Sequence, residues 1–97
     1  MLGFYVVITL YSKINTCIYS LSIAFSLDVK TKEMLGLVAS MVLRCDDCIK
    51  YHLGKCHEAG VNSEEMNEIF MIANLVGGSI VIPHYRRAVE YWDELNA

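Results

Sequence analysis

The fold of this 97-residue chain is decided by one stretch, residues 27–69, which reads LDVKTKEMLGLVASMVLRCDDCIKYHLGKCHEAGVNSEEMNEI. Its apolar residues recur three and four positions apart, which is the spacing of one face of an α-helix. Asp28 can cap the first helix, because a short acidic side chain accepts hydrogen bonds from the first free N–H groups. The apolar positions expected on that helix are Met34, Leu35, Val38, Met41 and Val42.

The helical pattern continues along the rest of this stretch. A second helix is predicted from about Cys45 to Ala59, and Gly60 follows it at the position where helices often end in a left-handed residue. The inner face expected for this helix consists of Cys48, Ile49, His52, Leu53, Cys56 and Ala59.

Two more helices are predicted beyond it. Asn62 and Glu65 have the spacing of a capping box, with Ser63 as a rival cap for the third helix. The glycine pair at 77–78 ends that helix, and Pro83 suits the first turn of a fourth. Four consecutive helical patterns with short joints predict an all-α fold, a small helical bundle.

Composition bounds the class of protein further. The chain is 55% apolar and 20% charged, with a net charge of −3. It therefore has no basic footprint for a nucleic acid. One domain is expected at this length, and the apolar surplus predicts that copies of the chain assemble into a homo-oligomer.

Residues 1–27 form an apolar segment ahead of the helical domain at 28–97, because Lys13 is the only charged residue before Asp28. We interpret the segment as buried in the core or between subunits. A membrane span would need about 20 nearly uninterrupted apolar residues, whereas polar residues occupy positions 12, 13, 15 and 16 here. A signal peptide would need a basic start and a small-residue cleavage pattern, and neither is found. Residues 4–9 are β-branched and aromatic, so their local preference is strand-like.

Cys45, Cys48 and His52 are expected on one side of the second helix, since they lie three and four positions apart. A thiol at a helix start is stabilised as the reactive thiolate by free N–H groups and by the positive end of the helix dipole. A second cysteine one turn away can capture an oxidised sulfur as a disulfide, and a histidine can move protons. Arg44 would also favour a thiolate if its side chain turned inward. These residues predict a thiol oxidoreductase.

Two other interpretations of the cysteines are weaker. A lone C-x-x-C is often simple packing, because a free cysteine behaves as a small hydrophobe. A zinc site built from residues 45, 48, 52 and 56 would require one helix to close a tetrahedron around ligands spread over ~16 Å. We therefore expect no metal. The remaining cysteines and histidines are interpreted as packing or surface residues: Cys17, Cys56, His57 and His84.

Glu33, Cys45, Cys48 and His52 together read E-x11-C-x-x-C-x3-H. This pattern resembles the core motif of the carboxymuconolactone decarboxylase superfamily, in its alkylhydroperoxidase D branch, over about residues 27–95. The resemblance implies an all-helical domain that assembles into trimers or hexamers, with a peroxidase cycle on the two cysteines. It also implies that Cys48 attacks the peroxide and Cys45 resolves it, with Glu33 and His52 as a proton relay.

The resemblance implies partners as well. The substrate would be a hydroperoxide, and an external lipoamide-like dithiol on a reductase partner would reduce the disulfide, with no bound cofactor. Some relatives carry a histidine before the second cysteine, where this chain has Asp47; a carboxylate that faced the sulfur would raise the pKa of a nearby thiol. The alternatives are a carboxymuconolactone decarboxylase-type lyase and a non-enzymatic oligomeric module. Four cysteines without a convincing signal sequence favour a cytoplasmic location.

Spacing alone does not bring Glu33 to His52. Glu33 lies ~18 Å of helix before Cys45, whereas His52 lies ~10 Å after it. Two ideal antiparallel helices would leave a gap, which a crossing angle, a loop or a bridging water would have to close.

Overall fold

The computed structural model describes residues 26–97, and over this range it contains helices and no strand. The predicted all-α fold is therefore confirmed. The elements, in chain order, are α2 (Val29–Val42), α3 (Asp46–Glu58), α4 (Ser63–Gly77), a 3-10 helix (Ser79–Val81) and α5 (Ile82–Leu95). The predictions made for the N-terminal segment, including its burial, its strand-like stretch and the role of Cys17, lie outside the described residues.

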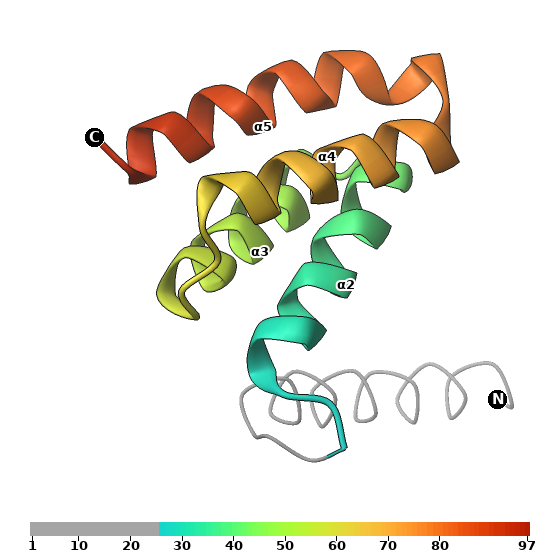
Figure 1. Cartoon of the computed structure of the whole chain (residues 1–97). Helices are drawn as coiled ribbons and strands as arrows, with labels where there is room; N and C mark the ends of the chain where they lie inside the picture. The colour runs from blue at the N-terminus through green and yellow to red at the C-terminus, as the bar shows by residue number, and fades with distance from the viewer. Residues whose placement is uncertain (1–25) are drawn as a thin grey trace, which may run out of the picture.

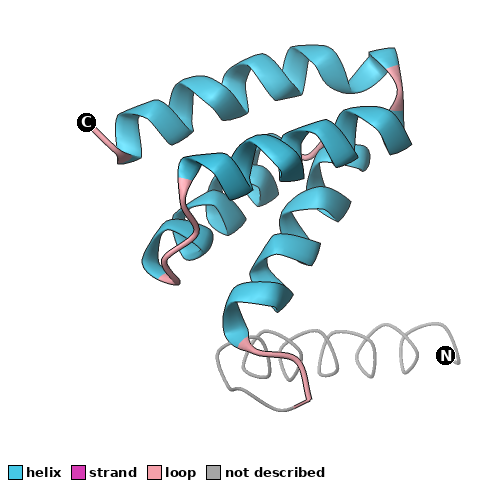
Figure 2. Cartoon of the chain, viewed as in Figure 1, coloured by secondary structure: helices cyan, strands magenta, loops and turns pink. Residues whose placement is uncertain are grey.

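The four long helices pack around one apolar core. Helix α2 packs against both α3 and α4, and α5 lies against α3 on the side away from α2 (Figure 1). Short loops join the helices (Figure 2). The core is formed by residues from every helix: Leu37, Met41, Ile49, Leu53, Cys56, Val61, Met66, Ile69, Phe70, Ala73, Val81, Ala88 and Trp92.

The helix ends lie where the capping residues predict them. The Asp28 side chain accepts a hydrogen bond from the Thr31 N–H at 2.7 Å, so α2 begins as expected. Asn62 is the cap of α4, because its side chain accepts the Glu65 N–H at 2.8 Å while the Glu65 side chain accepts the Asn62 N–H at 3.0 Å. This reciprocal capping box excludes Ser63 as the cap.

The buried face of α2 differs from the predicted stripe. Leu35, one of the expected apolar positions, is 56% exposed, whereas Leu37, which was not among them, is fully buried. Met41 is buried as predicted. Helix α2 has apolar residues on two faces, and the second face lines a groove shared with α4. Periodicity therefore predicted the helix correctly but could not decide which apolar face meets the core.

Among the described helices, none combines the length and the apolar character needed to cross a membrane.

Candidate active site

The turn between α2 and α3 fixes where the first cysteine lies. The Cys45 N–H donates to the Ser40 carbonyl at 3.1 Å, and the Arg44 N–H donates to the Met41 carbonyl at 3.0 Å. This pair of bonds is a Schellman motif, which requires a left-handed residue after the helix. Arg44 supplies it with φ of 59°, whereas Gly60, at the end of α3, takes that role with φ of 86°. The motif turns the chain within three residues, from the end of one helix to the start of the next.

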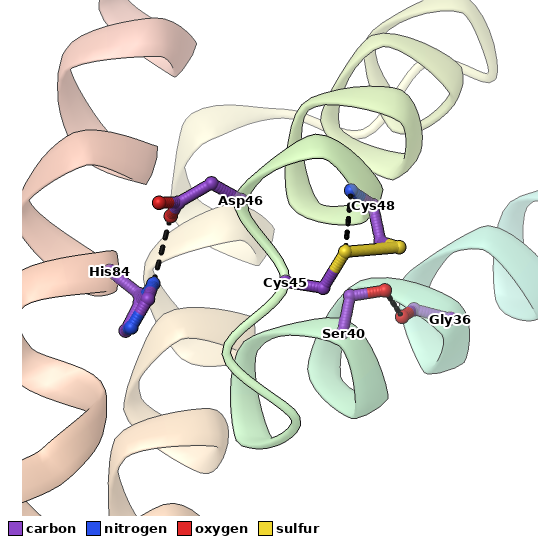
Figure 3. The surroundings of a disulfide bond; sticks show 6 residues. All are labelled: Gly36, Ser40, Cys45, Asp46, Cys48 and His84. Atoms are coloured by element: carbon purple, nitrogen blue, oxygen red, sulfur yellow. Dashed lines mark hydrogen bonds and ion pairs between the residues drawn. A yellow bond between two sulfur atoms is a disulfide. The ribbon is translucent and has the colours of Figure 1, made fainter.

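Cys45 is the N-cap of α3 and lies just outside the helix, with φ −102° and ψ 99°. Its sulfur accepts a hydrogen bond from the Cys48 N–H at 3.3 Å, so a helix N-terminal donor points at sulfur. The two cysteines are paired as a disulfide, with their Cα atoms 5.3 Å apart (Figure 3). That Cα separation lies inside the range that disulfides adopt. Because Cys45 is extended, the pair closes without unwinding α3. Cys48 is exposed and Cys45 is half-buried.

Glu33 and His52 meet directly, without a bridging water. Nδ1 of His52 lies 2.7 Å from Oε2 of Glu33. A carboxylate can only accept hydrogen bonds, so Nδ1 is the donor and Nε2 is left as the nitrogen that can exchange a proton. Glu33 is 2% exposed, and His52 is 15% exposed at its side chain.

The loop explains how the gap between these two residues is closed. Helix α2 ends at Val42 and α3 begins at Asp46. Glu33 is therefore only ~14 Å of helix before the loop, and His52 is ~9 Å after it. The two lengths of helix thus differ by less than the spacing in the sequence suggested, and the long side chains of Glu33 and His52 span the remaining difference.

Gly36 is a site residue that sequence reasoning missed. A Cβ atom at this position would lie 2.6 Å from Cε1 and 2.9 Å from Nδ1 of His52, so the imidazole rests directly on the glycine backbone. The Ser40 hydroxyl, buried one turn later, donates to the Gly36 carbonyl at 2.7 Å. The sequence did contain a signal for this contact: a glycine three residues after Glu33, inside a predicted helix. Glycine inside a helix is destabilising, so its presence there indicates close packing.

His84 was predicted to be a surface histidine, but it is half-buried and paired. Its Nδ1 lies 2.8 Å from Oδ1 of Asp46, the first residue of α3. Arg87 approaches the other carboxylate oxygen at 3.2 Å. The hydrogen bond from His84 lowers the pKa of Asp46 most, and Arg87 lowers it further against the opposing effect of burial. Helix α5 is thereby joined to the helix turn that carries the cysteines (Figure 3).

Cys56 is a core residue, as predicted, and it is fully buried. Burial, with the nearby Glu33 carboxylate adding to it, raises the pKa of its thiol to about 12. A thiol with this pKa is not a nucleophile near neutral pH. Within residues 26–97, no group of three or more His, Cys, Asp and Glu side chains could hold a metal ion.

The comparisons with known proteins establish the family. The model of the Carboxymuconolactone decarboxylase family matches residues 12–91, so the chain belongs to this family. The match begins inside the apolar N-terminal segment, ahead of the domain boundary expected at residue 28. An uncharacterized protein from Cupriavidus necator is 28% identical over 72 residues, which are 74% of this chain and 64% of that relative. The chain thus spans less than two thirds of that protein's length.

Solved structures of the same family have the same fold. A Thermotoga maritima member, for which a part in an antioxidative response has been suggested, is 50% identical with a TM-score of 0.80, and the match covers 94% of this chain and 91% of that one. A second Thermotoga maritima structure is 52% identical with a TM-score of 0.82, covering 89% and 75%. A Legionella pneumophila family protein is 22% identical with a TM-score of 0.80, covering 92% and 80%, and supports the fold alone.

Proposed function

We propose that this protein is a thiol-dependent peroxidase that cycles through a Cys45–Cys48 disulfide. One observation supports it most strongly: Cys45 caps α3 with its sulfur on a backbone N–H, at disulfide distance from an exposed Cys48. The suggested antioxidative role of the Thermotoga maritima relative agrees with this proposal.

The reaction balances with one hydroperoxide and one dithiol per turn. The Cys48 thiolate attacks the distal oxygen of ROOH, the O–O bond breaks, and the products are a sulfenic acid and an alcohol once the alkoxide takes a proton. The Cys45 thiol then attacks that sulfur and forms the disulfide. The displaced hydroxide takes the thiol proton and leaves as water. An external dithiol, lipoamide-like in chemistry, returns both thiols by exchange and becomes a disulfide itself.

Cys48 is assigned the attacking role because it is the more exposed of the two sulfurs and lies one turn before His52. The cap position gives Cys45 the better thiolate stabilisation, which makes it a good leaving group when the dithiol reduces the disulfide. The exposed Cys48 is therefore the sulfur that peroxide can reach, and Cys45 is the sulfur whose thiolate is better stabilised.

His52 would supply the proton that the leaving alkoxide needs. Glu33 fixes the Nδ1 side of its ring, which orients Nε2 and stabilises the imidazole when it is charged. A glutamate that is 2% exposed and has one histidine partner is costly to keep for packing alone.

The decisive test is a thiol count under denaturing conditions, before and after one equivalent of hydroperoxide. The chain has four cysteines, so four thiols should fall to two and a Cys45–Cys48 peptide should be found. Cys48→Ser should abolish turnover. Cys45→Ser should give one burst of peroxide consumption and a trapped sulfenic acid on Cys48. The reversed pattern would exchange the two roles.

Cys56→Ser is the matched control, because that thiol is buried near Glu33 but does not ionise near neutral pH. It should keep the peroxide reaction. If peroxide leaves all four thiols free and the Cys45→Ser/Cys48→Ser variant still processes a lactone, the protein is a decarboxylase-type lyase instead.

A further inference from the structure

We propose that His84 and Arg87 are positioning residues that hold the Asp46 carboxylate away from the cysteine pair and neutralise it, so that the pair keeps a reactive thiolate. The inference rests on the proposed redox function of that pair. His84 and Arg87 lie on α5 and have no place in the cycle described above.

Asp46 lies between the cysteine pair on one side and His84 and Arg87 on the other. It follows Cys45 directly and precedes Cys48 by two residues, at the first position of α3. The Asp46 side chain nevertheless points toward His84, away from the two sulfur atoms (Figure 3). Both of its oxygens are engaged, Oδ1 with His84 at 2.8 Å and Oδ2 with Arg87 at 3.2 Å.

The two aspartates inside the C-x-x-C motif have opposite effects on the helix and on the thiols. An acidic residue in the first turn stabilises a helix, since it faces the positive end of the dipole. The same negative charge opposes ionisation of a thiol beside it. A chain that has aspartates at both inner positions of its C-x-x-C needs a device that keeps the first of them from the sulfurs.

Helix α5 supplies that device. His84 is partly buried, and Arg87, one turn later, also contacts the His84 ring at 3.2 Å, so the two form one cluster on the carboxylate. The charged residues closest to Asp46 along the chain are Arg44 in the preceding turn and Asp47 and Lys50 on α3. In the described part of the chain, none of these three is hydrogen-bonded or ion-paired to Asp46, whose partners are His84 and Arg87. The charge of Asp46 is thus balanced from α5.

The test measures the rate at which iodoacetamide alkylates Cys45 and Cys48 in the reduced full-length protein at pH 7, read by peptide mass spectrometry. His84→Ala/Arg87→Ala should slow alkylation of the reactive thiol about three- to tenfold, the size expected for a half-exposed like charge released a few ångströms away. His84→Gln, which can still donate a hydrogen bond, should fall between this variant and the wild type. Arg86→Ala is the matched control, because it removes a neighbouring cation that has no ion-pair partner among residues 26–97; it should leave the rate unchanged.

The Asp46→Asn background separates positioning from a direct effect of the cations. There, the same double substitution should change the rate by less than about twofold, because no carboxylate remains to be released. An equal slowing in both backgrounds would mean that His84 and Arg87 act on the sulfur themselves, and it would overturn the proposal. So would an unchanged rate in the double variant with Asp46 intact, provided that its circular dichroism is that of the wild type.

A second measurement keeps the proposal falsifiable if that variant is poorly folded. Single His84→Gln and Asp46→Asn variants are compared by the equilibrium of the Cys45–Cys48 disulfide with dithiothreitol. His84→Gln should make the disulfide harder to reduce and Asp46→Asn easier, and shifts in the same direction would overturn the proposal. Both measurements need only the two thiols and no peroxidase activity. If the variants change alkylation as predicted but the wild-type protein does not react with hydroperoxide, only the peroxidase proposal is refuted.

Discussion

Nδ1 of His52 lies 2.7 Å from Oε2 of Glu33, although the two residues are nineteen positions apart in the sequence. The contact joins α2 to α3, and the Glu33 side chain that makes it is buried. Among residues 26–97, His52 is the hydrogen-bond partner of the buried Glu33 carboxylate. Removing the imidazole would therefore leave this carboxylate without its donor.

Glu33→Gln and His52→Ala should each slow peroxide turnover by about 10²–10⁴, the usual size of general acid–base assistance. Their effects should not add, because the two groups act as a unit. The double variant should therefore be no slower than His52→Ala alone. Stopped-flow peroxide consumption measures all three, and additive losses would contradict the relay.

Stability should separate the two single variants. His52→Ala leaves Glu33 buried without its partner, so it should lower the free energy of unfolding by about 1–3 kcal/mol. Glu33→Gln keeps the shape and a hydrogen-bonding group, so its loss should be smaller. Urea denaturation of the reduced proteins gives both values; full turnover in destabilised variants would show that the pair is structural.

Gly36→Ala should slow turnover by displacing the His52 ring, since a Cβ atom would lie 2.6 Å from Cε1. The matched control is Gly54→Ala on α3, where a Cβ atom would meet nothing within 4 Å. The control should gain up to about 1 kcal/mol of stability from helix propensity and keep its activity. Equal activity in both variants would show that the imidazole position tolerates a methyl group.

The helices were predictable because their signals are local. Asp28, the Asn62–Glu65 box and the glycines after α3 and α4 each act within a few residues, and the structure has helix ends at all of them. Which apolar face of α2 meets the core depends instead on where α3 and α4 lie. That is why the apolar positions expected from the spacing include the exposed Leu35 and omit the buried Leu37.

The site divides in the same way. Cys45, Cys48 and His52 belong to one helix turn and its continuation, so spacing brings them together. The contact between Glu33 and His52 could be expected only from the family resemblance. The length of the loop between α2 and α3, and not the helix period, decides which residues of the two helices lie opposite each other. His84 comes from a helix 38 residues further along the chain than Asp46, and no sequence period connects the two.

Arg44→Gly should stabilise the fold by up to about 1 kcal/mol, because a left-handed conformation costs a residue with a side chain roughly that much or more. Gly60→Ala is the converse change in the same motif at the end of α3, and it should destabilise by a similar amount. Thermal unfolding of the reduced proteins compares them. A destabilised Arg44→Gly would mean that the arginine side chain contributes more than its backbone conformation costs.

The apolar face shared by α2 and α4 leads to the last prediction, that the protein is a homo-oligomer, most simply a trimer or hexamer, which buries this face. Several large apolar side chains are exposed in the described part of the chain. Leu35, Leu43, Ile72 and Val76 line the groove between α2 and α4, and Ile72 also belongs to an adjoining groove of α4 that Met71 and Leu75 line. Monomeric soluble proteins rarely leave a contiguous patch of this kind open to water. Neither Cys45 nor Cys48 lines either groove.

Leu75→Glu should shift the oligomer toward monomer, because Leu75 is the most exposed of these side chains at 86% and a buried glutamate without a partner is costly. Asp93→Lys, an exposed substitution on α5, should leave the assembly intact. Light scattering at micromolar concentration measures both. A wild-type protein that is monomeric there would refute the prediction, and one that partitions into detergent would indicate that the apolar residues meet a membrane instead.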